Sequence, residues 1–106
     1  MEINFKEGVP FKGLKAITYQ AMFICAQVFN KKHVPLVVTC TTDGQHMKKS
    51  FHYTGEAFDI RTRRLTVVEK TRLYNEIKLE LQKLSEYFQV VMEDTHIHVE
   101  HDWRQS

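Results

Sequence analysis

The sequence predicts an α+β fold in which a small, mainly antiparallel sheet carries two main helices on one face. Two long stretches repeat apolar residues at the 3.6-residue period of a helix, and several short stretches show the alternation or the β-branched content of strands. The order of these stretches, with a polar turn between the last two strands, favours an antiparallel sheet covered by helices. With 106 residues, 42% of them hydrophobic, the chain has room for one core, so we expect a single domain over residues 1–106.

The first helix is expected over residues 14–31, where apolar side chains recur at spacings of three and four. This helix is expected to end before Pro35, because proline disfavours helical backbone in the residue before it. Residues 36–41 are apolar and β-branched, which predicts a buried strand, and a polar loop comes after them.

A second strand is expected over residues 57–61, whose alternation places Asp59 on the face opposite to the large apolar side chains. Thr66 and Glu69 have the spacing of a capping box and precede a run of apolar residues with helical period. The second helix is therefore expected over residues 67–87. Phenylalanines at helical spacing are expected in the core: Phe23, Phe29 and Phe88.

The last two strands are expected over residues 89–92 and 96–100, joined by a three-residue polar turn of hairpin length. Alternation in the second of them predicts a core face of isoleucine and valine. The opposite face then carries three polar residues, His96, His98 and Glu100.

Charge and hydropathy exclude several kinds of partner. The formal net charge of +2 is small for a protein that wraps a polyanion, so we expect no nucleic-acid partner. No apolar stretch approaches the roughly 20 residues that span a bilayer, and the charged N-terminal residues do not resemble an export signal. We therefore expect no membrane partner and synthesis in the cytoplasm, where Cys25 and Cys40 are more often reduced than paired. The sequence leaves the oligomeric state open.

Histidines and carboxylates cluster in two short segments, and three of these residues could form a zinc site: His52, Asp59 and His98. Catalytic zinc sites use three nitrogen or oxygen donors and keep one position for water, whereas the chain has too few cysteines for a four-cysteine structural site. Taken singly, each residue is also typical of a surface role. Asp59 could pair with Arg61, for example, and His96 and His98 could lie on a solvated strand face.

The spacing of these residues resembles a known family. Residues 50–61 read Ser-Phe-His-Tyr-Thr-Gly-Glu-Ala-Phe-Asp-Ile-Arg and match the pattern Ser-x-His-x-x-Gly-x-Ala-x-Asp, and residues 96–98 match a closing His-x-His. Over residues 37–100 the chain is similar to the D-Ala-D-Ala carboxypeptidase family of zinc peptidases. This resemblance implies the hedgehog/DD-peptidase-like version of the predicted fold.

The resemblance also implies roles for the motif residues. It makes His52, Asp59 and His98 the ligands of one Zn²⁺ per chain. Ser50 and Glu100 would then orient these ligands through hydrogen bonds.

The acid/base is implied less directly, because the family often has an acidic residue three positions before the last histidine, where this chain has Thr95. Related members use a glutamate slightly further back, so Glu93 is the first candidate and Asp94 the alternative. His96 resembles a histidine that stabilises the oxyanion. Arg61 is a candidate for binding a substrate carboxylate, although a solvated basic turn also explains it.

The resemblance therefore predicts a zinc-dependent metallopeptidase that hydrolyses amide bonds in peptidoglycan stem peptides, as a D,D-carboxypeptidase or an endopeptidase. An endolysin of a phage, made in the cytoplasm and acting on the bacterial cell wall after release, fits this expectation. The alternative is a non-catalytic, zinc-stabilised binding module of the same fold, as in the hedgehog signalling domain. The alternative stays open because the chain has Thr95 at the position where the family often has an acidic residue.

Overall fold

The computed structural model describes residues 2–43, 51–52 and 54–105 and contains a five-stranded sheet with two long helices. The elements follow the chain as β1 (Ile3–Phe5), α1 (Ala16–Lys31), β2 (Leu36–Cys40), β3 (Ala57–Arg61), α2 (Val67–Leu84), β4 (Phe88–Met92), β5 (His96–His101) and a short 3-10 helix, η1 (Trp103–Gln105). The strand order is β1-β2-β3-β5-β4. Among the described strands, β1 and β2 pair in parallel and the other neighbours pair antiparallel, which confirms the predicted α+β fold.

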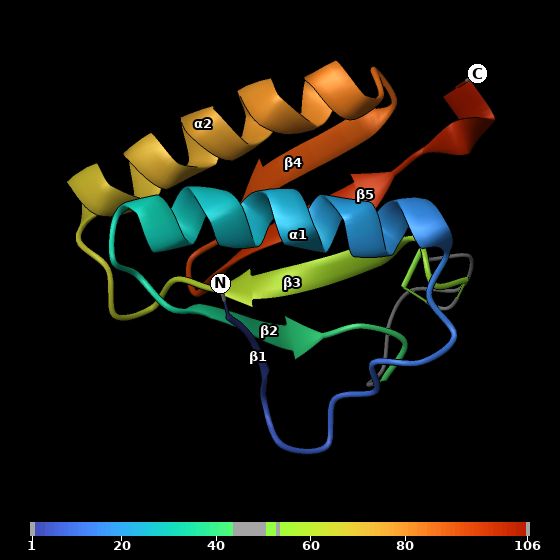
Figure 1. Cartoon of the computed structure of the whole chain (residues 1–106), viewed down its shortest axis with the longest axis horizontal. Helices are drawn as coiled ribbons and strands as arrows, with labels where there is room; N and C mark the ends of the chain where they lie inside the picture. The colour runs from blue at the N-terminus through green and yellow to red at the C-terminus, as the bar shows by residue number, and fades with distance from the viewer. Residues whose placement is uncertain (1, 44–50, 53, 106) are drawn as a thin grey trace.

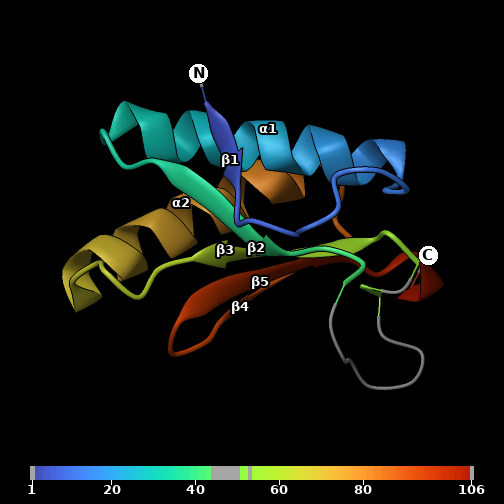
Figure 2. The same cartoon turned by 90° about the horizontal axis from the view of Figure 1, so that it is seen from below.

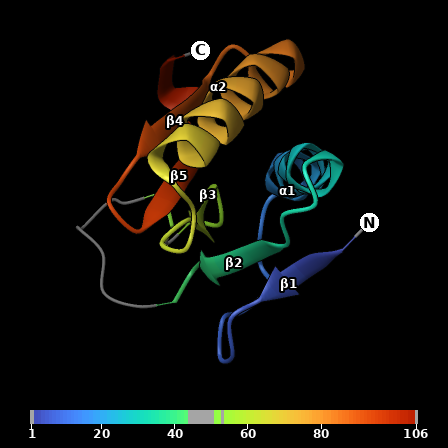
Figure 3. The same ribbon diagram turned by 90° about the vertical axis from the view of Figure 1, so that its left-hand side faces the viewer.

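Helices α1 and α2 lie side by side on one face of the sheet (Figure 1). Seen along the helices, α1 covers the β1–β2 side and α2 covers the β4–β5 side (Figure 3). The view from below shows both helices on the same side of the strands (Figure 2). The opposite face of the central strands is therefore free to carry polar side chains. No described helix is both long and apolar enough to cross a membrane.

The core fills the space between the helices and the sheet. Its largest fully buried side chains come from both layers and include Phe29, Phe58, Ile60, Leu73, Ile77, Leu81 and Ile97. Each side chain of this size stabilises the fold by about 1.5–3 kcal/mol when it leaves water. The alternation in β5 is as expected, because Ile97 and Val99 are buried while the residues between them face the other side.

The start of α2 is fixed by the capping box that the sequence predicts. The Thr66 hydroxyl accepts a hydrogen bond from the Glu69 amide at 3.1 Å, and the Glu69 carboxylate accepts one from the Thr66 amide at 2.9 Å. The helix ends at Leu84, three residues earlier than expected, because Ser85 has extended backbone and leads into β4.

Two features differ from the sequence-based expectation. The short strand β1 was not predicted, because three residues are too few to show a period, and it is held by parallel pairing with β2. Phe23 is 56% exposed instead of buried, since it lies outside the buried stripe of α1. Phe29 and Phe88 are buried as expected, and Cys25 and Cys40 are both free thiols.

The turn that precedes β3 is anchored to the start of α1 through Gly55. Its carbonyl accepts hydrogen bonds from the Lys15 amide at 2.9 Å and from the Thr18 hydroxyl at 2.8 Å. Gly55 has a φ of +74°, and a Cβ there would collide with the Gly13 carbonyl oxygen and lie 2.9 Å from the Leu14 Cα. Only glycine allows this approach of two backbones, which fixes the position of the loop carrying His52.

We expect Gly55→Ala to destabilise the fold by about 1–3 kcal/mol more than Gly8→Ala does, because overpacking adds to the left-handed backbone penalty. Gly8 is a matched control, since it also has positive φ, but a Cβ added there would meet no atom within 4 Å. The free energies of unfolding can be compared in urea. Equal losses of unfolding free energy in the two variants would show that the close approach of Gly55 to Gly13 does not affect stability.

Candidate metal centre

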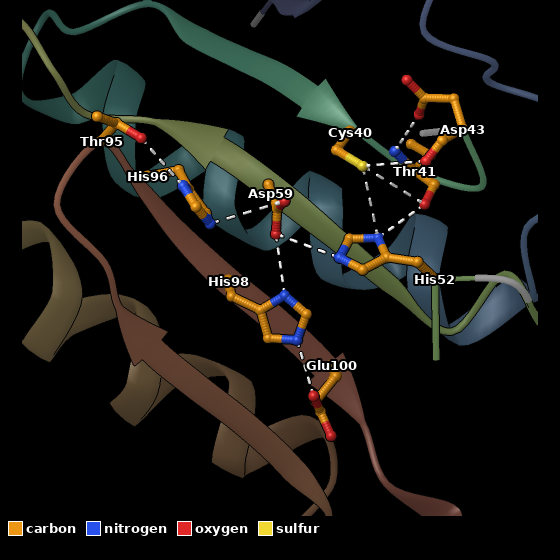
Figure 4. Close-up of polar contacts among 9 residues, drawn as sticks. All are labelled: Cys40, Thr41, Asp43, His52, Asp59, Thr95, His96, His98 and Glu100. Carbon is orange, nitrogen blue, oxygen red and sulfur yellow. Dashed lines mark hydrogen bonds and ion pairs between the residues drawn. The ribbon is translucent and has the colours of Figure 1, made fainter. Parts of the chain in front are cut away.

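The centre is built around Asp59, in the middle of β3, which is a central strand of the sheet. Across the sheet, Asp59 stands opposite Cys40 of β2 on one side and His98 of β5 on the other. Residues that stand opposite each other on neighbouring strands project to the same face. Cys40, Asp59 and His98 therefore lie on the face away from the helices, and the close-up shows the rings of His52, His96 and His98 approaching the Asp59 carboxylate (Figure 4).

His52 approaches Asp59 from the loop before β3 and is held by a backbone carbonyl. Its Nδ1 lies 2.7 Å from the Thr41 carbonyl oxygen. A carbonyl can only accept a hydrogen bond, so Nδ1 carries a proton and Nε2 is the nitrogen that is left to face Asp59. This Nε2 lies 3.4 Å from Asp59 Oδ1. This contact is favourable when a proton on Nε2, or a metal ion in its place, lies between the nitrogen and the carboxylate oxygen.

His98 faces the same oxygen of Asp59 from β5. Its Nδ1 lies 2.9 Å from Asp59 Oδ1, and its Nε2 lies 2.7 Å from Glu100 Oε1. Both partners are acceptors, so in the metal-free protein both ring nitrogens carry protons. Glu100 keeps the proton on Nε2 in either state and directs Nδ1 at Asp59, which is how carboxylates orient metal-binding histidines.

The electrostatics of this cluster favour a positive charge beside Asp59. Burial raises the pKa of Asp59, but hydrogen bonds from His52 and His98 outweigh it and hold the pKa well below its ordinary value. Burial lowers the pKa of His98, but its hydrogen bonds to Asp59 and Glu100 outweigh this effect and raise the pKa to about 9. Asp59 is thus ionised at neutral pH, and in the metal-free protein protons supply the compensating positive charge.

His96 lies on the other side of the Asp59 carboxylate. Its Nε2 is 3.7 Å from Asp59 Oδ2, and its Nδ1 is 3.2 Å from the Thr95 hydroxyl. Histidine rings thus approach both oxygens of Asp59.

Cys40 is the member of the cluster that sequence reasoning missed. One ligand atom each from Cys40, His52 and Asp59 lie within 4.8 Å of one another, so this group could hold a metal ion. The Cys40 Sγ lies 3.9 Å from His52 Nδ1, the nitrogen that faces Thr41. Burial, followed by the charges of Asp43 and Asp59, raises the pKa of the Cys40 thiol to about 12. The only sequence signal was its position at the end of the first predicted strand.

Two of the separations in this cluster, both measured to Asp59 Oδ1, are close to the spacing of neighbouring ligands on a metal ion such as zinc. Zinc–ligand bonds of about 2.0–2.1 Å in a tetrahedral arrangement place neighbouring nitrogen and oxygen ligands about 3.3 Å apart. The 3.4 Å from His52 Nε2 and the 2.9 Å from His98 Nδ1 to Asp59 Oδ1 bracket this value. His52 and His98 thus each approach the same oxygen of Asp59 at this spacing, whereas the three residues whose ligand atoms all lie within 4.8 Å of one another are Cys40, His52 and Asp59.

Other predicted site residues lie around this cluster or outside it. Arg61 lies two residues beyond Asp59 on β3, opposite His96. Glu93 and Asp94 are exposed in the β4–β5 turn, and the Glu93 carboxylate makes no hydrogen bond or ion pair with the described residues. Ser50 falls outside the described residues.

Comparison with known proteins does not assign the chain to a family. No family model matches the chain, and no curated protein matches its sequence. The resemblance to zinc peptidases stays a prediction from the motif residues, and the case for a function depends on the arrangement around Asp59.

Proposed function

We propose that this protein is a zinc-dependent peptidase that hydrolyses amide bonds in the stem peptides of bacterial peptidoglycan. One observation carries the proposal: His52 and His98, from separate motifs, direct ring nitrogens at the same Asp59 oxygen. The motif with Asp59 and the motif with His98 lie 39 residues apart in the sequence. Side chains that bind the same ion must converge in this way, whereas polar side chains on a solvated strand face need not do so.

The side chains of His52, Asp59 and His98 would hold the zinc ion. When bound, zinc supplies a Lewis acid that polarises a carbonyl group and makes water more acidic. The Thr41 carbonyl and the Glu100 carboxylate fix which nitrogen of each histidine faces the ion.

His96 and Glu93 would act on the substrate. The ring of His96 lies beside Asp59 and would donate a hydrogen bond to the carbonyl oxygen as negative charge develops on it. Glu93 would accept a proton from water and return it to the leaving amine.

Strand pairing supports Glu93 over Asp94 as this acid/base. Val91 of β4 stands opposite His98, so both project to the site face, and the next residue on that face of β4 is Glu93. The Glu93 amide donates to the His96 carbonyl at 2.9 Å, which continues the ladder by one residue. Asp94 lies in the turn, where its carbonyl accepts a hydrogen bond from Lys70 of α2.

A second function, a non-catalytic zinc-stabilised binding module, is favoured by Cys40. If the thiolate joined His52, Asp59 and His98, four protein donors would close the coordination shell, as in structural zinc sites. Against this, the Cys40 sulfur lies near Nδ1 of His52, whereas Nε2 faces Asp59. We therefore prefer the three-ligand, catalytic arrangement.

The first test of this proposal is zinc content. The parent protein should bind about one zinc per chain, and His52→Ala, Asp59→Ala and His98→Ala should each lower zinc affinity at least tenfold, because each removes one of three ligands. Titration with a competing chromophoric chelator, followed by elemental analysis, measures this.

His33→Asn is the matched control and should keep full zinc content. His33 lies after α1 with a φ of +58°, a backbone conformation that asparagine tolerates. Full occupancy in all three ligand variants would contradict the proposed site.

Replacing zinc with cobalt tests the role of Cys40. The three-ligand arrangement predicts no thiolate-to-cobalt charge-transfer band in the near ultraviolet, and unchanged metal affinity in Cys40→Ser. A band that disappears in Cys40→Ser would instead show a four-donor site and favour the binding module.

The acid/base is tested by Glu93→Gln, which keeps the side-chain size but removes the basic oxygen. Hydrolysis of purified stem peptides, followed by mass spectrometry, should fall by about 100-fold or more while zinc content is unchanged. Asp94→Asn is the control and should have a much smaller effect. Cleavage at the parent rate by Glu93→Gln would exclude Glu93 as the base.

A further inference from the structure

Three of the four exposed aromatic side chains in the described part of the chain lie close together. Phe11 is 58% exposed, Tyr19 37% and Phe23 56%, whereas the fourth, Trp103, belongs to the short helix near the C-terminus. Tyr19 and Phe23 are one turn apart on α1, so their side chains lie on the same side of the helix. The Tyr19 hydroxyl donates a hydrogen bond to the Phe11 carbonyl, which joins Phe11 to this pair. We call these three residues the aromatic row.

The aromatic row has the properties of a binding surface. Single exposed apolar side chains are common on proteins, but a group of neighbouring ones is typical of a surface that contacts a ligand or a partner. Phe11 is also held in place, because its ring packs against Phe5 of β1 with the ring centroids 6.2 Å apart. Side chains that are ordered before binding lose little conformational freedom when a ligand covers them.

The aromatic row is connected to the metal centre through Pro10. The segment between β1 and α1 passes the end of β2, where the Pro10 carbonyl accepts a hydrogen bond from the Thr41 hydroxyl at 2.5 Å (Figure 1). The Thr41 carbonyl accepts the hydrogen bond that orients His52 in the metal centre. Phe11 directly follows Pro10, so the row begins next to the residue that positions a proposed zinc ligand.

We propose that the aromatic row binds the glycan strand to which the stem peptide is attached; this inference rests on the proposed function. A sugar ring has a face of C–H groups, and stacking this face on an aromatic ring removes apolar surface of both from water. Each stem peptide is linked covalently to a sugar of the strand. A surface that begins beside the metal centre would therefore meet the sugars next to the peptide that is cleaved.

Continuity with the metal centre favours the glycan over other occupants of the row. A membrane surface or a second copy of the chain would need no connection to the site. A bound strand, by contrast, would hold its stem peptides near the metal centre and raise their effective concentration there. The row would thus act on the affinity for the substrate and not on the chemical step.

The first experiment measures binding of chitohexaose, a peptide-free oligosaccharide of N-acetylglucosamine, to the full chain with and without added zinc. Phe11→Ser and Phe23→Ser should each weaken binding by about two- to tenfold, because each removes one stacking ring. Phe23→Tyr keeps a ring and should bind like the parent. Leu79→Ser is the control, because Leu79 is 60% exposed on α2, away from the row. NMR titration gives the affinities, and melting temperatures show that each variant is folded.

The second experiment compares two substrates, a free stem peptide and the same peptide attached to a tetrasaccharide of the glycan. The zinc-loaded parent should cleave the attached peptide with a KM at least about fivefold lower than the free peptide and with a similar kcat. The double variant Phe11→Ser, Phe23→Ser should lose this difference in KM. It should cleave the free peptide at the parent rate.

The outcomes separate this inference from the proposed function. If the parent cleaves the free peptide but chitohexaose binds equally to the parent and to the serine variants, the glycan surface is wrong and the peptidase proposal stands. If binding of chitohexaose depends on the row but the zinc-loaded parent cleaves neither substrate, the glycan surface is supported and the peptidase proposal fails. If the serine variants instead lose only sedimentation with anionic phospholipid vesicles, or only dimerisation in the ultracentrifuge, a membrane or a second copy covers the row and the inference is overturned.

Discussion

Asp59 is only 9% exposed, and its carboxylate must keep its charge in that position. A buried carboxylate is stable when positive charge and hydrogen-bond donors surround it. Here the imidazoles of His52, His96 and His98 fill that role, and each is within 3.7 Å of a carboxylate oxygen. The same arrangement that stabilises the ionised carboxylate also gathers groups that could hold a metal ion, because a metal ion can replace the protons between such groups.

The sheet makes this arrangement possible by placing β3 between β2 and β5. A central strand has neighbours on both sides, so Asp59 receives one partner from each of them in addition to the loop residue His52. The helices cover the other face, where alternate residues of the same strands form the core. Gly55 completes the arrangement, since its contact with the start of α1 holds the His52 loop over the sheet. Stability of the fold and geometry of the site therefore depend on the same strands.

Much of the fold could be predicted because its signals are local. The capping box at Thr66 and the alternation in β5 depend on residues within a few positions of each other, and both are present. The proximity of His52, Asp59 and His98 was also expected, from motif spacing and from resemblance, while their role as ligands is still a prediction.

Features that depend on distant contacts could not be predicted in this way. Cys40 faces Asp59 because the β2–β3 register shifts between Val38 and Cys40, and no local pattern encodes that shift. The link between the aromatic row and the metal centre also depends on such a contact, because Pro10 and Thr41 lie 31 positions apart.

The central claim is that one cation lies beside Asp59, between specific nitrogens of two histidines. Anomalous diffraction at the zinc absorption edge, from crystals of the zinc-loaded protein, tests it directly. The account predicts one strong peak per chain, bonded to Asp59 Oδ1, His52 Nε2 and His98 Nδ1, with Glu100 still bound to His98 Nε2. A peak at another position, or bonds through His52 Nδ1 and the Cys40 sulfur without His98, would contradict it.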